Sequence, residues 1–169
     1  MSKKLTRPGK PGAQPVYRNK PLQEHVHDSY KSRGKPPEPT VCPQCGAVFH
    51  MGRWQWLPKP EPAHSEMCPA CHRIHDNFPA GYVKLEGEFL TRHRAEISSL
   101  MHHIENKEKA AHPLQRIMNI VDEDGTMLVT TTDIHLARDI GEAVRHAYQG
   151  HLEFHYNPEE NLVRVHWKR

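Results

Sequence analysis

The four cysteines of this chain form two short pairs, and their spacing is the clearest chemical signal in the sequence. Cys42 and Cys45 belong to one C-x2-C turn, and Cys68 and Cys71 form a second such turn after 22 intervening residues. Each turn presents two thiolates on one side of a tight knuckle, and four thiolates arranged as a tetrahedron suit zinc. The spacing therefore predicts one structural Zn²⁺ with a closed four-cysteine shell. An iron–sulfur cluster and a redox dithiol are the alternatives.

The segment between the two turns must bring them together. Residues 47–57 predict a β-hairpin with Met51 and Gly52 at its turn. Trp54 and Trp56 share one face of the second strand, since side chains alternate along a strand. We expect these rings to cover the zinc knuckle, with stacking on a nucleic-acid base as the alternative. Four nearby histidines are expected to lie around the site rather than to bind the metal, namely His50, His64, His72 and His75.

The second half of the chain predicts a small α+β domain. Apolar residues recur on one helical face through residues 89–109, and a second helix begins at Thr132 or Asp133 and stops before Gly150. Alternating or turn-bounded segments predict strands at 116–122, 126–131, 152–156 and 162–167. The expected order is α-β-β-α-β-β, with one antiparallel sheet and both helices on one of its faces. The expected domains are a basic arm (1–40), a four-cysteine zinc module (41–82) and the α+β domain (83–169).

Charge is distributed unevenly along the chain. Residues 1–40 contain nine Lys or Arg and three acidic residues, which gives a net charge of +6. The remaining residues contain 14 Lys or Arg and 17 acidic residues, which gives a net charge of −3. The arm also holds seven of the 15 prolines and few large apolar residues, so it cannot bury enough surface to fold alone. We interpret it as a disordered arm that binds a polyanion along its phosphates. The alternative is a tail that only improves solubility.

Further basic groups lie on the predicted folded parts. The two C-terminal strands place His155, Arg164, His166 and Lys168 on one face, which is either a solvated surface or a surface facing RNA. The candidate RNA-binding residues are therefore Lys3, Lys4, Arg7, Lys10, Arg18, Lys20, Lys31, Arg33, Lys35, Arg53, Arg73, Arg164, His166 and Lys168.

Several functional classes lack support in the sequence. No run of about 18 apolar residues and no apolar segment after the basic N-terminus is present, so we expect neither a membrane span nor a secretory signal. Thr132 and Asp133 suit helix capping, and no phosphate-binding loop, nucleophile elbow or H-E-x-x-H motif occurs. We therefore expect a cytoplasmic protein that is not an enzyme, with no membrane and no small-molecule substrate among its partners.

The paired knuckles and the α+β module that follows resemble the N-terminal part of the large-ribosomal-subunit nuclear-export adaptor family. A group of short bacterial proteins assigned to that family is more similar still. The resemblance covers about residues 40–169, and it is carried by Cys42-Pro43-Gln44-Cys45-Gly46, Cys68-Pro69-Ala70-Cys71, Phe78-Pro79-Ala80-Gly81-Tyr82, His112-Pro113-Leu114, Arg116-Ile117-Met118, Thr130–Arg138, Tyr148-Gln149-Gly150 and His155-Tyr156-Asn157. It implies zinc at the four cysteines and association with the ribosome. Nuclear export is not implied, because the additional domains and export signals of the long members are missing from this sequence.

The resulting hypothesis is a bacterial zinc protein that binds the ribosome through rRNA, with contacts to ribosomal proteins as a further option. We expect a dormancy or stress factor that modulates translation, ahead of an assembly or quality-control factor. The main alternative is a zinc-ribbon transcription regulator that binds DNA or RNA polymerase. Two further hypotheses are a protein–protein adaptor without nucleic-acid contact and a redox or zinc sensor.

Overall fold

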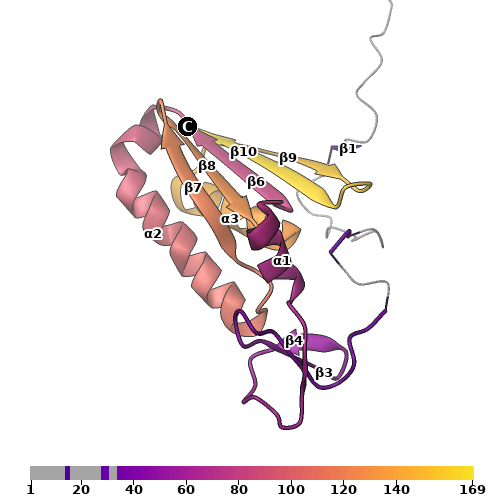
Figure 1. Ribbon diagram of the computed structural model, residues 1–169. Helices are drawn as coiled ribbons and strands as arrows, with labels where there is room; N and C mark the ends of the chain where they lie inside the picture. Colours follow the sequence, from indigo (N-terminus) through magenta and orange to yellow (C-terminus); the bar gives the residue numbers. More distant parts are fainter. Residues whose placement is uncertain (1–13, 16–27, 31–33) are drawn as a thin grey trace, which may run out of the picture.

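The computed structural model describes residues 14–15, 28–30 and 34–169, which form a small cysteine module and a larger α+β domain (Figure 1). The cysteine module, residues 40–76, has a sheet of short strands in the order β4-β3-β2-β5. Its elements are β2 (Thr40–Val41), β3 (Val48–His50), β4 (Arg53–Gln55), β5 (His64–Ser65) and α1 (Pro69–Asp76). The predicted hairpin is confirmed: Met51 and Gly52 form its turn with left-handed φ angles of 51° and 78°.

The α+β domain contains two long helices and one large mixed sheet. Its elements are β6 (Gly81–Glu86), α2 (Glu88–Ala111), β7 (Ile117–Glu123), β8 (Thr126–Thr131), α3 (Ile134–Tyr148), β9 (His151–Asn157) and β10 (Leu162–Lys168). The strand order is β1-β9-β10-β6-β8-β7, in which the two-residue β1 (Gln14–Pro15) pairs with the outer edge of β9. The predicted α+β class is confirmed. None of the helices in the described residues combines the length and apolar character needed to cross a bilayer.

The predicted order α-β-β-α-β-β is wrong at its start, because it lacks the central strand β6. This strand pairs with β10 in parallel and with β8 in the antiparallel direction, so the sheet is mixed rather than antiparallel. The six residues of β6 follow Pro79 closely and contain only two buried large aliphatic side chains, Val83 and Leu85. Such a short alternating segment is a weak signal, and the expected boundary between residues 82 and 83 falls inside it. Helix α1 is likewise a helix that the sequence did not predict.

Both long helices contribute to one core on a single face of this sheet. Nineteen buried residues form that core; Leu90, Ile97 and Met101 come from α2, and the predicted stripe of α3 supplies others. In Figure 1 α3 lies behind the sheet and α2 runs beside β7. The packing is close, because a Cβ at Gly141 would come within 2.5 Å of Cγ1 of Val165. The alternate residues of the strands face the other way and form an open sheet face.

Candidate metal centre and its surroundings

Two different local structures present the four cysteines. Cys42 follows β2, where its N–H donates to the carbonyl of Ala47 over 2.8 Å and its own carbonyl accepts from Gly46 over 2.9 Å. Gly46 has a φ of 79°, a left-handed conformation that favours glycine. Cys68 is the N-cap of α1 and accepts a hydrogen bond from the N–H of Cys71 over 3.5 Å. Pro69 then occupies the first helical position, where its missing N–H is not needed.

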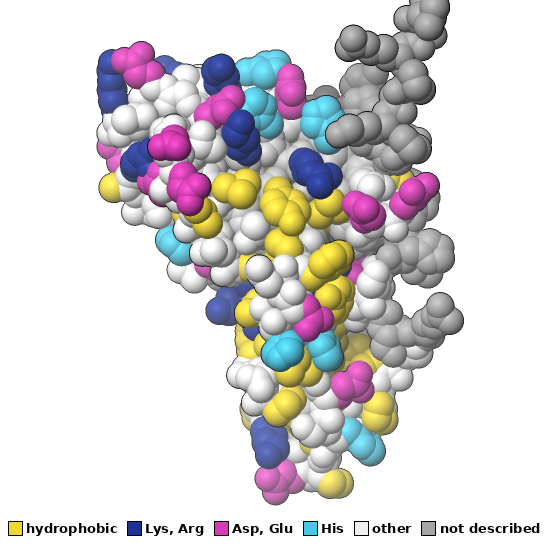
Figure 2. All heavy atoms as spheres, turned by 45° about the horizontal axis from the view of Figure 1, so that its top comes forward, with side chains coloured by type: hydrophobic (Ala, Val, Ile, Leu, Met, Phe, Trp, Pro, Cys, Tyr) yellow, Lys and Arg dark blue, Asp and Glu magenta, His cyan; other side chains and the backbone are white. Residues whose placement is uncertain are grey.

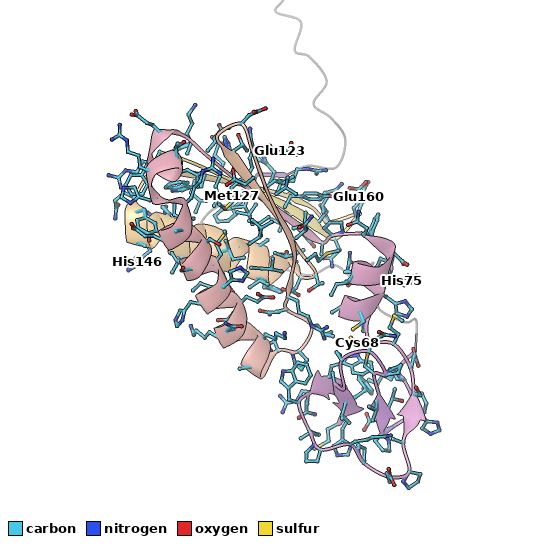
Figure 3. All side chains as sticks on the ribbon, turned by 60° about the vertical axis from the view of Figure 1, so that its left-hand side comes forward. Cys68, His75, Glu123, Met127, His146 and Glu160 are labelled. Carbon is cyan, nitrogen blue, oxygen red and sulfur yellow. The ribbon has the colours of Figure 1, made fainter. Side chains whose placement is uncertain are left out.

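These two turns bring the four sulfur atoms close together. Their Sγ atoms lie within 4.8 Å of one another and could hold a metal ion, and none of the cysteines forms a disulfide. Cys42, Cys68 and Cys71 are buried, and Cys45 is partly exposed. Figure 3 shows Cys68 at the junction between α1 and the strands of the module. The predicted grouping of the four cysteines is therefore confirmed.

A buried arginine from the α+β domain completes this cluster. Arg116 lies between α2 and β7, and its guanidinium contacts Sγ of Cys45 at 3.1 Å, of Cys71 at 3.3 Å and of Cys68 at 3.8 Å. Burial opposes its charge, but the hydrogen bonds to Cys45 and Cys71 raise the pKa of Arg116 above its ordinary value. Four thiolates around a divalent ion carry a net charge of −2, so the guanidinium offsets half of it. Sequence reasoning did not assign Arg116 a role near the cysteines.

The thiols differ in their surroundings. Burial raises the pKa of Cys68 and of Cys71. Burial also acts on Cys42, but backbone N–H groups, first that of Cys68, outweigh it and lower the pKa of Cys42 to about 7. Deprotonation, which metal binding requires, is therefore easier at Cys42 than at Cys68 or Cys71.

Thr132 and Asp133 hold Arg116 and the start of α3 in place. The hydroxyl of Thr132 accepts from the N–H of Arg116 over 2.9 Å and donates to the carbonyl of Leu114 over 2.6 Å. Asp133 caps α3 by accepting from the N–H groups of His135 and Leu136 over 2.8 and 3.1 Å. The predicted capping role is confirmed for Asp133, whereas Thr132 connects the metal centre to the large sheet.

The two tryptophans fasten the hairpin to different neighbours. Trp54 packs against the cysteine cluster and contacts Phe49 edge to face, with ring centroids 5.5 Å apart. Trp56 donates from Nε1 to the carbonyl of Lys109 at the end of α2 over 2.7 Å, and the Arg116 guanidinium lies 6.0 Å from its ring centroid. The expected covering role thus holds for Trp54, while Trp56 joins the cysteine module to the α+β domain.

The candidate RNA-binding residues lie in three settings. Lys35, which precedes the cysteine module, and Arg53 within the module are exposed, and Arg164, His166 and Lys168 lie on the open sheet face. Arg73 is instead 2% exposed and forms an ion pair with Asp28 over 2.6 Å, so it is not a surface cation. The remaining candidates lie outside the described residues: Lys3, Lys4, Arg7, Lys10, Arg18, Lys20, Lys31 and Arg33.

A cleft of about 990 Å³ lies where the cysteine module meets the α+β domain. The hairpin, α1 and the start of α3 all contribute to its wall, which includes Trp54, His72 and Asp133. Comparisons with known proteins give no relative for this arrangement: no family model, no curated protein and no solved structure matches the chain.

Proposed function

We propose that this protein is a zinc-containing, ribosome-associated factor that binds rRNA in the bacterial cytoplasm. Within that class we favour a dormancy or stress factor that modulates translation. The proposal combines the family resemblance of residues 40–169 with the charge of the N-terminal arm. It assigns binding, and not catalysis, to the described residues, since Thr132 and Asp133 are engaged in structural hydrogen bonds.

Zinc is the metal that the cysteine geometry favours. A tetrahedron of Zn–S bonds of about 2.3 Å has edges of about 3.8 Å. The Sγ atoms of Cys45 and Cys68 are 3.8 Å apart, which matches such an edge. Four sulfur ligands leave no position for a water molecule or substrate, so the zinc would support the fold rather than a reaction.

One observation carries the assignment of a polyanionic partner. Two of the three acidic residues in the arm are already engaged with the folded parts. Asp28 pairs with the buried Arg73, and Glu38 accepts from the N–H groups of Met51 and Gly52, each over 2.8 Å. Those hydrogen bonds hold the pKa of Glu38 below its ordinary value. These two carboxylates therefore do not neutralise the arm, whose remaining positive charge suits the phosphates of RNA.

The test is sedimentation of the tagged full-length protein through sucrose gradients at low and high salt, from growing and from starved cells. We expect it to migrate with ribosomal particles at low salt and to be released at high salt. Enrichment in starved cells would support a dormancy role, and migration with immature subunits would support assembly instead. A protein that stays at the top of every gradient would overturn the proposal. Capture of DNA or RNA polymerase would then favour the transcription alternative.

Two variants test the contribution of the arm. Replacing the six Lys and Arg of residues 1–27 by Gln keeps the anchor at Asp28 and should weaken ribosome binding. Six phosphate contacts would give a slope of log K against log[salt] of about −4 to −5, which this variant should largely lose. A second variant with the same residues in scrambled order keeps the charge and should bind like the unmodified protein. Equal binding by the Gln variant would show that the arm is not the contact.

A further inference from the structure

The open face of the large sheet carries a row of side chains that crosses all five long strands. The strand register aligns His155 of β9, Arg164 of β10, Tyr82 of β6, Thr130 of β8 and Asn119 of β7. Four steps between strands of about 4.8 Å make this row about 19 Å long. We name these five residues the sheet row.

The sheet row contains no acidic residue, although acids lie beside it. Glu86 is held by Lys84 over 2.8 Å and by His166 over 2.9 Å, and these two hydrogen bonds lower its pKa to about 2. Glu153 is held by His151 over 2.8 Å and also lies 3.8 Å from Nε2 of His155 in the row. Both of these carboxylates are therefore already paired with basic groups. Figure 2 shows Lys, Arg and His side chains gathered with acidic side chains over the upper part of the molecule.

Arg164 keeps its charge available on this surface. It is exposed, and among the described residues no carboxylate forms an ion pair with it. Its guanidinium lies over the ring of Tyr82, 5.7 Å from the ring centroid. The side chains therefore present a flat aromatic ring and a cation next to each other, and beyond them Thr130, Asn119 and His155 offer hydrogen-bonding groups. This combination suits a base that stacks on the ring while its phosphate approaches the guanidinium.

We propose that the sheet row binds a short stretch of unpaired RNA, with Tyr82 as the stacking residue and Arg164 as the phosphate contact. This inference rests on the proposed function and adds to it the chemical form of the RNA. Sheets that bind single-stranded RNA stack two or three bases on exposed aromatic residues. A duplex is a poor fit, because its bases are stacked on one another and cannot reach Tyr82. The arm would supply charge attraction, and the sheet row would select unpaired nucleotides.

The experiment measures the affinity of the zinc-loaded full chain for a labelled 10-nucleotide single strand of uridine and adenosine and for a blunt-ended RNA duplex that has no unpaired nucleotide. Fluorescence anisotropy at several salt concentrations gives both affinity and salt slope. We expect tighter binding of the single strand. Tyr82→Leu should weaken that binding about 5- to 100-fold with no change in salt slope, whereas Tyr82→Phe should retain it because the ring remains. Arg164→Gln should reduce the salt slope by about 0.7.

Matched controls come from α3 on the other side of the sheet. Tyr148→Leu and Arg145→Gln repeat the same chemical changes there and should bind the single strand like the unmodified protein. Folding of each variant is checked by zinc content and by circular dichroism.

The outcomes separate this inference from the proposed function. If the unmodified protein binds RNA but Tyr82→Leu and Arg164→Gln bind equally well, the sheet row is not the RNA contact, while the proposed function stands. Equal affinity for the blunt-ended duplex would also overturn the inference. If the unmodified protein binds no RNA at about 0.15 M salt, both fail. Loss of a protein partner without loss of RNA binding in these variants would assign the face to protein docking and overturn the inference.

Discussion

The cysteine module and the α+β domain are held together by different means. Eight buried apolar residues belong to the module, three of them cysteines, whereas nineteen buried residues form the core of the domain. A core of eight mostly small side chains cannot offset the conformational entropy of about 40 ordered residues. We therefore expect the module, but not the domain, to depend on a metal held by the four cysteines. The two parts meet at Arg116, which belongs to the domain by sequence and contacts the sulfur cluster of the module.

The largest effect should follow from removing the metal. Chelation, or the substitution Cys68→Ser, should unfold the cysteine module, because structural zinc contributes about 10–16 kcal/mol to folding in small zinc-finger peptides. Amide hydrogen exchange should show loss of protection across residues 40–76, with protection retained in β6, β8 and β10. Those strands act as the internal control. Loss of protection throughout the α+β domain would show that the two parts fold as one unit.

A smaller effect, on metal affinity, should follow from substituting Arg116, where the two parts meet. Arg116→Gln removes the cation that contacts three sulfurs, and loss of such a supporting group typically lowers metal affinity by about 10- to 100-fold. Competition with a chromogenic chelator would measure this change. Arg116→Lys keeps the positive charge but lacks the two terminal nitrogens of the guanidinium, and it should give an intermediate zinc affinity. Arg145→Gln on α3 is the matched control and should leave zinc affinity unchanged. Unaltered affinity in Arg116→Gln would mean that the two parts are independent after all.

Substitution of Asp133, the N-cap of α3, tests the stability of the α+β domain without changing a metal ligand. Asp133→Ala removes the acceptor for two N–H groups of the first helical turn and should lower the free energy of unfolding by about 1 kcal/mol. Urea denaturation followed by circular dichroism would measure the change. Asp133→Asn keeps an acceptor and should recover most of the stability. Zinc content should stay constant in both variants, and a parallel loss of zinc would contradict the separation between the two parts.

The smallest expected effect is the contribution of Glu86, on the open face, to the pH dependence of the unfolding free energy. Hydrogen bonds from Lys84 and then His166 lower the pKa of Glu86 to about 2. A carboxylate with a depressed pKa stabilises the fold above its unfolded pKa of about 4.3, and this stabilisation is lost as pH falls towards 2. Glu86→Gln should therefore reduce the pH dependence of the unfolding free energy between pH 5 and 2. The change should be about 0–1 kcal/mol because the pair is near the surface. Glu88→Gln is the control, and an equal effect there would exclude a special role for Glu86.

Sequence reasoning succeeded where local chemistry decides the outcome. The spacing of Cys42, Cys45, Cys68 and Cys71 predicted one cluster, and Met51-Gly52 predicted the hairpin turn. The apolar stripe of α3 and the strand Thr126–Thr131 were also predicted correctly. Sequence reasoning missed β6, because a six-residue strand at the centre of a sheet is defined by its neighbours β8 and β10 rather than by its own hydrophobic pattern. It also assigned Arg73 to the RNA surface, since burial against Asp28 depends on a contact 45 residues away.

The sequence by itself thus determined a cluster of four thiols that could hold a metal ion, an α+β fold class and a basic N-terminal segment, all of which depend on residue types within short segments. Only the tertiary structure decided that Arg116 lies against the thiols and that Tyr82 and Arg164 lie side by side on one sheet face. These contacts join residues that are 45 to 82 positions apart in the chain. The strand register and the packing of both helices on one face create them, and neither follows from the local sequence around any one of these residues.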